Sequence, residues 1–199
     1  STPYDIKSVK LLKKLNINCF KTASTDLIDL LLHKEIIKTK KPVIISTGAS
    51  TMSEIKKTID FYKKNKYNKI SLLHCVSNYP SSIENQNLNA IKSMKKKFKC
   101  RVGYSDHTIG DLASIIAVTN GAEIIEKHIT LNNSMSGPDH KASMELRDFY
   151  SFVYKLKNID VIKGKHEKKC QKEEFKTKKI SRKSLYFSKN LKPGHALKE

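Results

Sequence analysis

The chain alternates short apolar runs with longer stretches in which apolar residues recur every three or four positions. The apolar runs are rich in β-branched residues and lack the polar alternation of a half-exposed strand, which indicates buried parallel strands. They cover Ile17 to Lys21, Pro42 to Thr47, Lys69 to Cys75, Cys100 to Tyr104 and Ala122 to Ile129. The runs recur at roughly 25 to 30 residues, the length of one β/α unit.

Helices are expected between these strands. Thr51 to Lys66 places Ile55, Ile59 and Tyr62 on one face and leaves lysines on the other, which is typical of an amphipathic surface helix. Similar patterns cover Leu88 to Phe98 and Leu112 to Thr119, and another begins at Ile6, directly after Ser1-Thr2-Pro3. The sequence therefore predicts a β/α order that starts as if a strand had just ended.

This order predicts an α/β fold of the TIM-type (β/α)8 barrel class. A closed barrel has eight strands and typically about 250 residues. Five units are visible, so the chain is expected to be truncated to about its last five β/α units. A complete five-stranded doubly wound sheet is the alternative, but the sequence lacks the glycine-rich phosphate loop expected after its first strand.

The composition changes after Leu156, which predicts three segments. Residues 1–157 are expected to form the C-terminal part of the barrel. Residues 158–179 are polar and lysine-rich, as in a basic linker with one helical turn. Ser184 to Ser188 resume a strand-like pattern, so residues 180–199 are expected to begin a second domain, too short to form its own core.

Length and composition restrict the class of protein. At 199 residues and 38% hydrophobic content, the chain can form one domain and a piece of another. It has no apolar run of about 18 residues and no secretory signal, so no membrane partner is expected. Cys19, Cys75, Cys100 and Cys170 are widely spaced, which predicts neither a disulfide framework nor a zinc knuckle and favours a cytoplasmic location.

The formal charge of +20 raises the question of nucleic-acid binding, because clustered lysines neutralise phosphates. The lysines here are dispersed over solvent-side helix positions and the tail, and no motif interleaves aromatic residues with arginines. A noncatalytic basic binding module stays open as an alternative. A solvated basic surface that suits anionic substrates is favoured, with no nucleic-acid partner.

Polar side chains follow each predicted strand. In parallel β/α barrels the carboxyl ends of the strands build the site, so these positions are functional candidates. They are Lys21 and Ser24, then Ser46 and Thr47, then His74, Ser77 and Asn78, then Ser105, Asp106 and His107, and finally Glu126, Lys127 and His128.

His107 and His128 follow neighbouring predicted strands. Adjacent strand ends can direct two imidazoles at one ion, with other positions left for water and substrate oxygens. Such a site suits Mn²⁺, Mg²⁺ or Zn²⁺ acting as a Lewis acid on a carbonyl. The alternative is that each histidine only donates hydrogen bonds across the end of the barrel.

A second group of residues combines positive charge with hydroxyl and amide donors, which bind phosphate and carboxylate groups well. Its members are Lys21, Lys127, Ser24, Ser46, Asn78 and Ser105. Asp139 lies in a later polar loop, where a turn that caps the helix from Met144 is favoured over a contact with sugar hydroxyls.

Several segments together resemble the N-acetylneuraminate synthase family, which includes the sialic, legionaminic and pseudaminic acid synthases. They are Ile45 to Ser50, Leu73 to Pro80, Val102 to Thr108, Glu126 to Leu131 and the loop Gly137 to Ser143. Arg182 to Tyr186 resembles the start of the family's antifreeze-like (SAF) domain. The resemblance covers almost the whole chain in order.

The resemblance implies a role for each matching residue. His107 and His128 match ligands of a divalent metal, usually Mn²⁺, with Mg²⁺ as an alternative. Glu126 lines the same pocket as a catalytic residue, and Asp139 holds the amino sugar, which reverses the preference for a turn. Phosphoenolpyruvate would be bound by Thr2, Lys21, Ser24, Ser46, Asn78, Ser105 and Lys127.

The resemblance also implies an activity: condensation of phosphoenolpyruvate with N-acetylmannosamine or a diacetamido hexose, giving a nonulosonic acid and phosphate. The family is expected to act as a homodimer. The family's first three barrel strands have no counterpart in this chain, so the 199 residues alone are expected to be inactive or very weak. Another phosphoenolpyruvate-aldose synthase, of the 3-deoxy-octulosonate type, is the nearest enzyme alternative.

Overall fold

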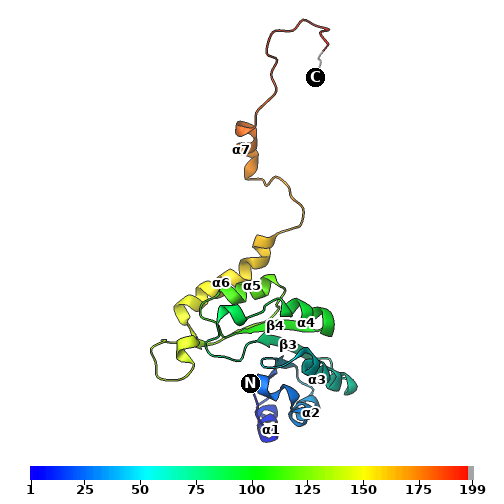
Figure 1. The fold of residues 1–199 in the computed structure, drawn as a ribbon, viewed down its shortest axis with the longest axis vertical. Coiled ribbons are helices and arrows are strands. Elements are labelled where there is room, and N and C mark those ends of the chain that lie inside the picture. The colour runs from blue at the N-terminus through cyan, green and yellow to red at the C-terminus, as the bar shows by residue number, and fades with distance from the viewer. Residues whose placement is uncertain (197–199) are drawn as a thin grey trace. The chain divides into compact units, whose positions relative to one another are not determined.

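The computed structural model describes residues 1–196, which divide into a first compact unit, Ser1–Ile162, and a second that begins at Lys163. The first unit contains a five-stranded sheet with helices around it (Figure 1). The strands are β1 (Phe20–Thr22), β2 (Val43–Ser46), β3 (Ile70–Cys75), β4 (Arg101–Asp106) and β5 (Ile125–Lys127). All neighbouring pairs are parallel and follow chain order.

The five predicted strands are confirmed, with one change at the last of them. The predicted run from Ala122 to Ile129 divides into β5 and a short strand β6 (Ile129–Thr130), which pairs with β7 (Met144–Glu145) in a separate sheet. The break falls at His128, whose carbonyl oxygen accepts a hydrogen bond from the Met144 backbone N–H at 2.9 Å. The chain leaves the main sheet there because the residues after β5 form their backbone hydrogen bonds with β7 instead of β4.

The sheet is strongly curved. Lys21 on β1 and Glu126 on β5 lie at opposite ends of the strand order, yet their Nζ and Oε1 atoms are 3.3 Å apart. Four strand spacings in a flat sheet would separate β1 from β5 by about 19 Å, which these two side chains cannot span. The sheet is therefore part of a barrel wall rather than an open doubly wound sheet.

The predicted helices are confirmed, and two further helices complete the first unit. The α-helices are α1 (Ile6–Lys14), α2 (Leu30–Lys38), α3 (Met52–Lys64), α4 (Ala90–Phe98), α5 (Leu112–Thr119) and α6 (Leu146–Lys163). Local sequence explains their starts: Thr51 and Glu54 form a capping box on α3, and the Asp29 side chain accepts from two backbone N–H groups at the start of α2. Short 3-10 helices lie at η1 (Ser24–Ile28), η2 (Ile83–Asn85) and η3 (His140–Ala142).

The core lies between the sheet and its helices. Phe20, Val43, Leu72 and Val102 are fully buried on four successive strands, and the helices contribute Ile36, Ile59, Ile91 and Ala117 to the same cluster. Burying each large apolar side chain contributes roughly 1.5–3 kcal/mol. This packing holds the strand ends in place and leaves their polar side chains to face the opposite side.

The second unit differs from the prediction. α6 runs past residue 157 to Lys163, and the eight-residue helix α7 (Glu174–Ser181) begins inside the predicted linker and ends two residues beyond it, where one helical turn was expected in the linker. Ser184 to Ser188 do not form a strand, and Leu185 and Tyr186 are 102% and 88% exposed. A strand needs a neighbour for its backbone groups, and no described segment supplies one. The assignment of residues 180–199 to a SAF domain stays a prediction, and 197–199 lie outside the described residues.

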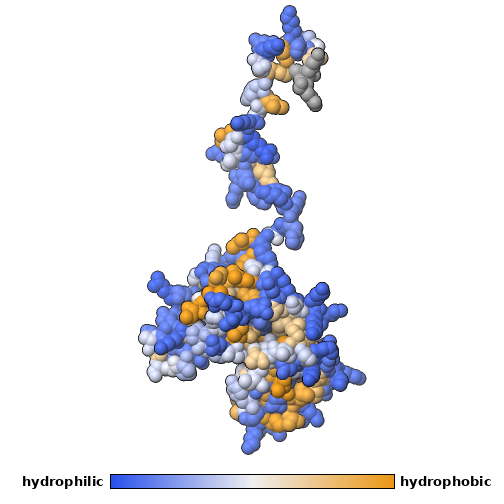
Figure 2. Space-filling view, viewed as in Figure 1, coloured by the Kyte–Doolittle hydropathy of each residue, from blue (hydrophilic) through white to orange (hydrophobic). Residues whose placement is uncertain are grey.

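The surface of the visible face is mostly hydrophilic (Figure 2). Figure 2 shows hydrophilic side chains spread over much of the visible face, with apolar groups gathered over α5 and α6. Exposed apolar residues on these two helices include Leu112, Ile116, Leu146, Tyr150 and Tyr154. Within residues 1–196, no helix is long and apolar enough to cross a bilayer.

Candidate active site

A cavity of about 520 Å³ lies where the strands end. Each of the five strands, or the loop directly after it, contributes polar side chains to the wall. The lining residues are Thr2, Tyr4, Lys21, Ala23, Ser24, Thr25, Ser46, Ser77, Tyr79, Ser105, His107, Glu126, His128 and Asp139. Of the residues that the family resemblance assigned to the site, all but Asn78 and Lys127 line this cavity; of the other strand-end candidates, Ser77 lines it, whereas Thr47, His74 and Asp106 do not.

Lys21 and Glu126 form the centre of a polar chain across the cavity. The Lys21 ammonium donates to Ser46 Oγ at 2.7 Å and pairs with Glu126 Oε1 at 3.3 Å. Ser105 Oγ donates to the same Glu126 oxygen at 2.7 Å. The lysine side chain is 18% exposed and the glutamate 40%, so both can exchange these partners for a ligand.

A small hollow at Gly48 forms a second part of the wall. The Gly48 backbone N–H donates to Ser24 Oγ at 3.1 Å. A Cβ at this position would lie 2.2 Å from Ser77 Oγ and 2.8 Å from Ser24 Oγ. Only glycine leaves room for the two hydroxyls, which together with the backbone N–H can surround an anionic group.

Asn78 does not reach the cavity. Its amide Nδ2 donates to the Pro80 carbonyl at 3.1 Å, and Ser77 lines the wall instead. Successive side chains of an extended segment point to opposite sides, so Ser77 shares the side of Cys75, whose Sγ lies 3.3 Å from Ser24 Oγ. That alternation is the signal that would have favoured Ser77 over Asn78.

His107 and His128 come together as predicted from their strand positions. Their ring centroids are 5.6 Å apart and the rings are perpendicular. His107 Nδ1 lies 2.7 Å from the Val76 carbonyl oxygen, which can only accept, so Nδ1 carries the proton and Nε2 keeps its lone pair. Burial lowers the pKa of His107, which favours the neutral imidazole that binds metals.

This donor set fits a divalent ion. Two imidazoles on adjacent strand ends can share one ion whose remaining ligands are water or substrate oxygens. Among residues 1–196, no group of three or more His, Cys, Asp or Glu side chains is placed to enclose a metal. Of the described residues, His107 and His128 would be the two that hold such an ion.

Tyr79 is a site residue that the sequence analysis missed. Its ring centroid is 4.1 Å from that of His107 and 5.4 Å from that of His128. Burial raises the pKa of its hydroxyl, and nearby carboxylates including Asp139 add to the effect, so the phenol remains a hydrogen-bond donor. In the sequence, Tyr79 directly follows the polar residues Ser77 and Asn78 and precedes Pro80. This position after a predicted strand could have identified it as a site residue.

Asp139 also lines the cavity. It precedes η3, where its carbonyl oxygen accepts the Ala142 backbone N–H at 3.1 Å, so the predicted turn forms, but its side chain makes no capping hydrogen bond. Its Oδ2 lies 3.9 Å from His128 Nδ1, and the side chain is 57% exposed. A carboxylate in this position can accept hydrogen bonds from a polyhydroxylated ligand.

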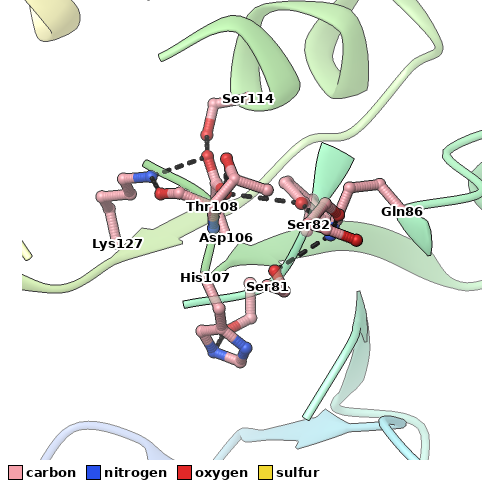
Figure 3. A network of polar contacts seen from close by, with 10 residues as sticks. Ser81, Ser82, Gln86, Asp106, His107, Thr108, Ser114 and Lys127 are labelled. Atoms are coloured by element: carbon pink, nitrogen blue, oxygen red, sulfur yellow. Dashed lines mark hydrogen bonds and ion pairs between the residues drawn. The ribbon is translucent and has the colours of Figure 1, made fainter. Parts of the chain in front are cut away.

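Lys127, predicted as a member of the phosphate-binding group, does not line the cavity. Its side chain is 2% exposed, and its Nζ lies 3.1 Å from Asp106 Oδ2 and 2.5 Å from the Thr108 carbonyl oxygen. Glu126 and His128 face the cavity, so Lys127 between them faces the opposite side, as strand geometry requires. Figure 3 shows the lysine directed at Asp106, which the sequence analysis had also included among the strand-end candidates.

Comparison with known proteins assigns this arrangement to a family. Residues 1–168 match the model of the NeuB family. The chain belongs to the NeuB family. Over 201 aligned residues, this NeuB chain is 42% identical to N,N'-diacetyllegionaminic acid synthase of Campylobacter jejuni, covering all of the chain and 60% of that relative. It is 36% identical to the pseudaminic acid synthase of Helicobacter pylori, over all of the chain and 58% of that relative.

A solved structure agrees with this placement. The N-acetylneuraminic acid synthetase of Leptospira borgpetersenii, in complex with citrate, superposes with a TM-score of 0.80 at 33% identity, covering 92% of this chain and 65% of that one. The match supports the interpretation of the curved sheet as part of a barrel. The NeuB chain spans about three fifths of the length of the relatives it matches.

Proposed function

We propose that this NeuB chain carries the C-terminal part of the active site of a nonulosonic acid synthase. The reaction would condense phosphoenolpyruvate with an N-acylated amino sugar aldehyde, N-acetylmannosamine or a diacetamido hexose. The observation that carries the proposal is the convergence of Lys21, Ser46, Ser105 and Glu126 with the His107 and His128 pair on one cavity.

The cationic and hydroxyl-lined side of the cavity would bind phosphoenolpyruvate. Lys21 supplies a positive charge with Ser46 beside it, and the hollow at Gly48 adds the hydroxyls of Ser24 and Ser77. A phosphate and a carboxylate need this combination of one compact charge and several oriented donors. Thr2 and Ser105 extend the same wall.

The opposite side would bind the sugar and a divalent ion. Asp139 would accept hydrogen bonds from sugar hydroxyls, and Tyr79 would cover the sugar chain beside the imidazoles. His107 and His128 would hold Mn²⁺, with Mg²⁺ as the alternative, which when bound supplies Lewis-acid polarisation of the aldehyde oxygen.

The bonds that change follow from this placement. C3 of phosphoenolpyruvate forms a bond to the aldehyde carbon, whose oxygen takes up a proton. Water adds at C2, and the C–O bond to phosphate breaks, which leaves a 2-keto-3-deoxy nonulosonic acid and inorganic phosphate. Glu126, which contacts Lys21 and Ser105, would accept a proton from that water. Lys21 would offset the negative charge that develops on the departing phosphate.

The proposal also covers the activity of these 199 residues alone, the active assembly and the cellular location of the reaction. Five strands leave the cavity open along one side, so the 199 residues alone should turn over very slowly or not at all. We further propose a homodimer as the active assembly, with residues 180–199 beginning a SAF-like domain. The four cysteines are free thiols, which fits the reducing cytoplasm where we place the reaction.

The test is phosphate release from phosphoenolpyruvate by the full-length natural protein with Mn²⁺. N-acetylmannosamine, the diacetamido hexoses and a phosphorylated pentose are supplied separately, and His107→Ala and His128→Ala are compared with the unaltered protein. Release that depends on an amino sugar and is lost in both variants supports the proposal. Release with the phosphorylated pentose alone would favour the octulosonate-type reaction, and release unaffected by both substitutions would remove the metal site from the mechanism.

A further inference from the structure

Behind the cavity wall lies a buried polar cluster that the proposed chemistry does not use. Asp106 is 1% exposed, and the side chain of Lys127 that pairs with it is 2% exposed (Figure 3). Asp106 lies between the cavity residues Ser105 and His107, and Lys127 lies between Glu126 and His128. Each member of the pair therefore separates two residues of the proposed site and points the other way.

Asp106 accepts an unusually complete set of hydrogen bonds. Its Oδ1 receives the backbone N–H of Thr108 at 2.8 Å and the Thr108 hydroxyl at 2.7 Å. Its Oδ2 receives the Ser114 hydroxyl at 2.6 Å and the ammonium of Lys127 at 3.1 Å. Lys127 also donates to the Thr108 carbonyl. The pair thus joins β5, the loop after β4 and the first turn of α5.

The cluster continues to the loop after β3. The Tyr104 hydroxyl donates to Gln86 Oε1 at 2.6 Å, and Gln86 Nε2 donates to Ser81 Oγ at 2.9 Å. The Ser81 backbone N–H in turn donates to the carbonyl of His107 at 2.9 Å. The backbone of His107 is therefore held from two directions, by the Asp106 turn and by the Ser81 loop.

The sheet ladder ends at this pair. Asp106 and Lys127 are the last partners in the β4–β5 register, and His107 and His128 follow one residue later on each strand. Beyond the ladder no regular backbone pairing fixes the distance between the two imidazoles. The ion pair is the last link between the strands before the histidines.

We propose that Asp106 and Lys127 are positioning residues that hold His107 and His128 at the separation required to share a divalent ion. The inference rests on the proposed function for the identity of the site. A buried ion pair is a weak source of stability, because apolar residues of similar volume often stabilise a fold as well or better. Its benefit here is directional, since it fixes the backbone beside the two metal ligands, while the Val76 carbonyl orients the His107 ring. Loss of a residue that supports metal ligands typically weakens metal binding about 10- to 100-fold.

The test compares Lys127→Met with Lys95→Met in the full-length natural protein. Lys95 is a matched control, because it too pairs with a carboxylate, Glu123 at 2.7 Å, and donates to a carbonyl, that of Gly121 at 2.8 Å. Lys95 lies on α4 and reaches residues that precede β5, away from the cavity, and its side chain is more exposed, at 35%. Mn²⁺ affinity is measured by electron paramagnetic resonance, and the ring nitrogens of His107 are observed by NMR of ¹⁵N-histidine-labelled protein without metal.

We expect Lys127→Met to raise the Kd for Mn²⁺ about 10- to 100-fold and Lys95→Met to leave it unchanged. We also expect Lys127→Met to shift or split the Nδ1-protonated signal of His107, because the loop that holds this ring against the Val76 carbonyl is no longer fixed. If Lys127→Met does not fold, Asp106→Asn/Lys127→Met takes its place, because it removes both charges, keeps the side-chain volumes and still breaks the link between the strands. An unaltered Kd and His107 signal in the folded variant, or an equal loss in Lys95→Met, overturns the inference.

The two measurements separate this inference from the proposed function. Failure of the unaltered protein to bind Mn²⁺ would count against the metal site itself. The NMR signal requires no metal, so it tests the positioning role even if the unaltered protein does not bind Mn²⁺: an unaltered His107 signal in the folded Lys127→Met variant would then overturn that role.

Discussion

Replacing Lys21 with methionine should weaken the binding of phosphoenolpyruvate while leaving the fold intact. Methionine keeps most of the length and apolar volume of the lysine stem and removes only the charge. The ammonium lies 2.7 Å from Ser46 Oγ and 3.3 Å from Glu126 Oε1, with the side chain 18% exposed. A ligand phosphate or carboxylate can take the place of these two partners, and Lys21 is the only lysine that lines the cavity among the described residues.

The expected size of the effect follows from the strength of a charge-assisted hydrogen bond. Such bonds contribute about 1.5–3 kcal/mol, which corresponds to about a 10- to 150-fold increase in the KM for phosphoenolpyruvate. The fold should lose far less, because an ion pair that is partly open to solvent contributes about 1 kcal/mol or less to stability. The KM for the amino sugar should change little, since Lys21 lies across the cavity from Asp139.

Steady-state phosphate release by the full-length protein measures both constants, and urea unfolding measures stability. Lys56→Met is the control, because Lys56 also pairs with a carboxylate, that of Asp60, at a surface site on α3 where the side chain is 59% exposed. An unchanged KM for phosphoenolpyruvate in a folded Lys21→Met protein, or an equal rise in Lys56→Met, would refute the assignment of this wall to the phosphate and carboxylate groups.

Two further substitutions test the cavity floor and the core. Gly48→Ala would place a methyl group 2.2 Å from Ser77 Oγ. We expect the displaced hydroxyl to lose its hydrogen bond to the anionic ligand, which would weaken phosphoenolpyruvate binding by about 1.5–3 kcal/mol, as measured by calorimetry. Unchanged affinity would contradict the proposed hollow. Burial lowers the pKa of His33, which contacts the Tyr62 hydroxyl at 2.8 Å and the Leu27 carbonyl at 3.1 Å. Below about pH 6.5 the unfolded chain takes up a proton that the folded His33 resists, so unfolding free energy should fall as pH falls, by up to about 1.4 kcal/mol per pH unit. His33→Gln should reduce that slope in urea titrations between about pH 7.5 and about pH 5.5, and an identical slope in both proteins would show that His33 is not the responsible group.

The sequence by itself determined the order of the elements and most of the candidate site. Apolar runs at the spacing of β/α units identified five parallel strands, because buried parallel strands need uninterrupted apolar residues. The sequence also identified most of the polar side chains of the candidate site, because they directly follow these apolar runs. A polar residue placed directly after such a run, as with Lys21, Ser46, His107 and Glu126, lies at the carboxyl end of a strand, and those ends converge at one end of a barrel.

Only the tertiary structure decided which of these polar residues face one another. Lys127 adjoins Glu126 in the sequence, yet the alternation of side chains sends it into the buried cluster with Asp106. Ser77 replaces Asn78 for the same reason, and the strand expected at 184–188 does not form because no described segment pairs with it. Sequence spacing indicates where along the chain a group lies, whereas the curvature of the sheet and the register of its strands decide which groups share a space.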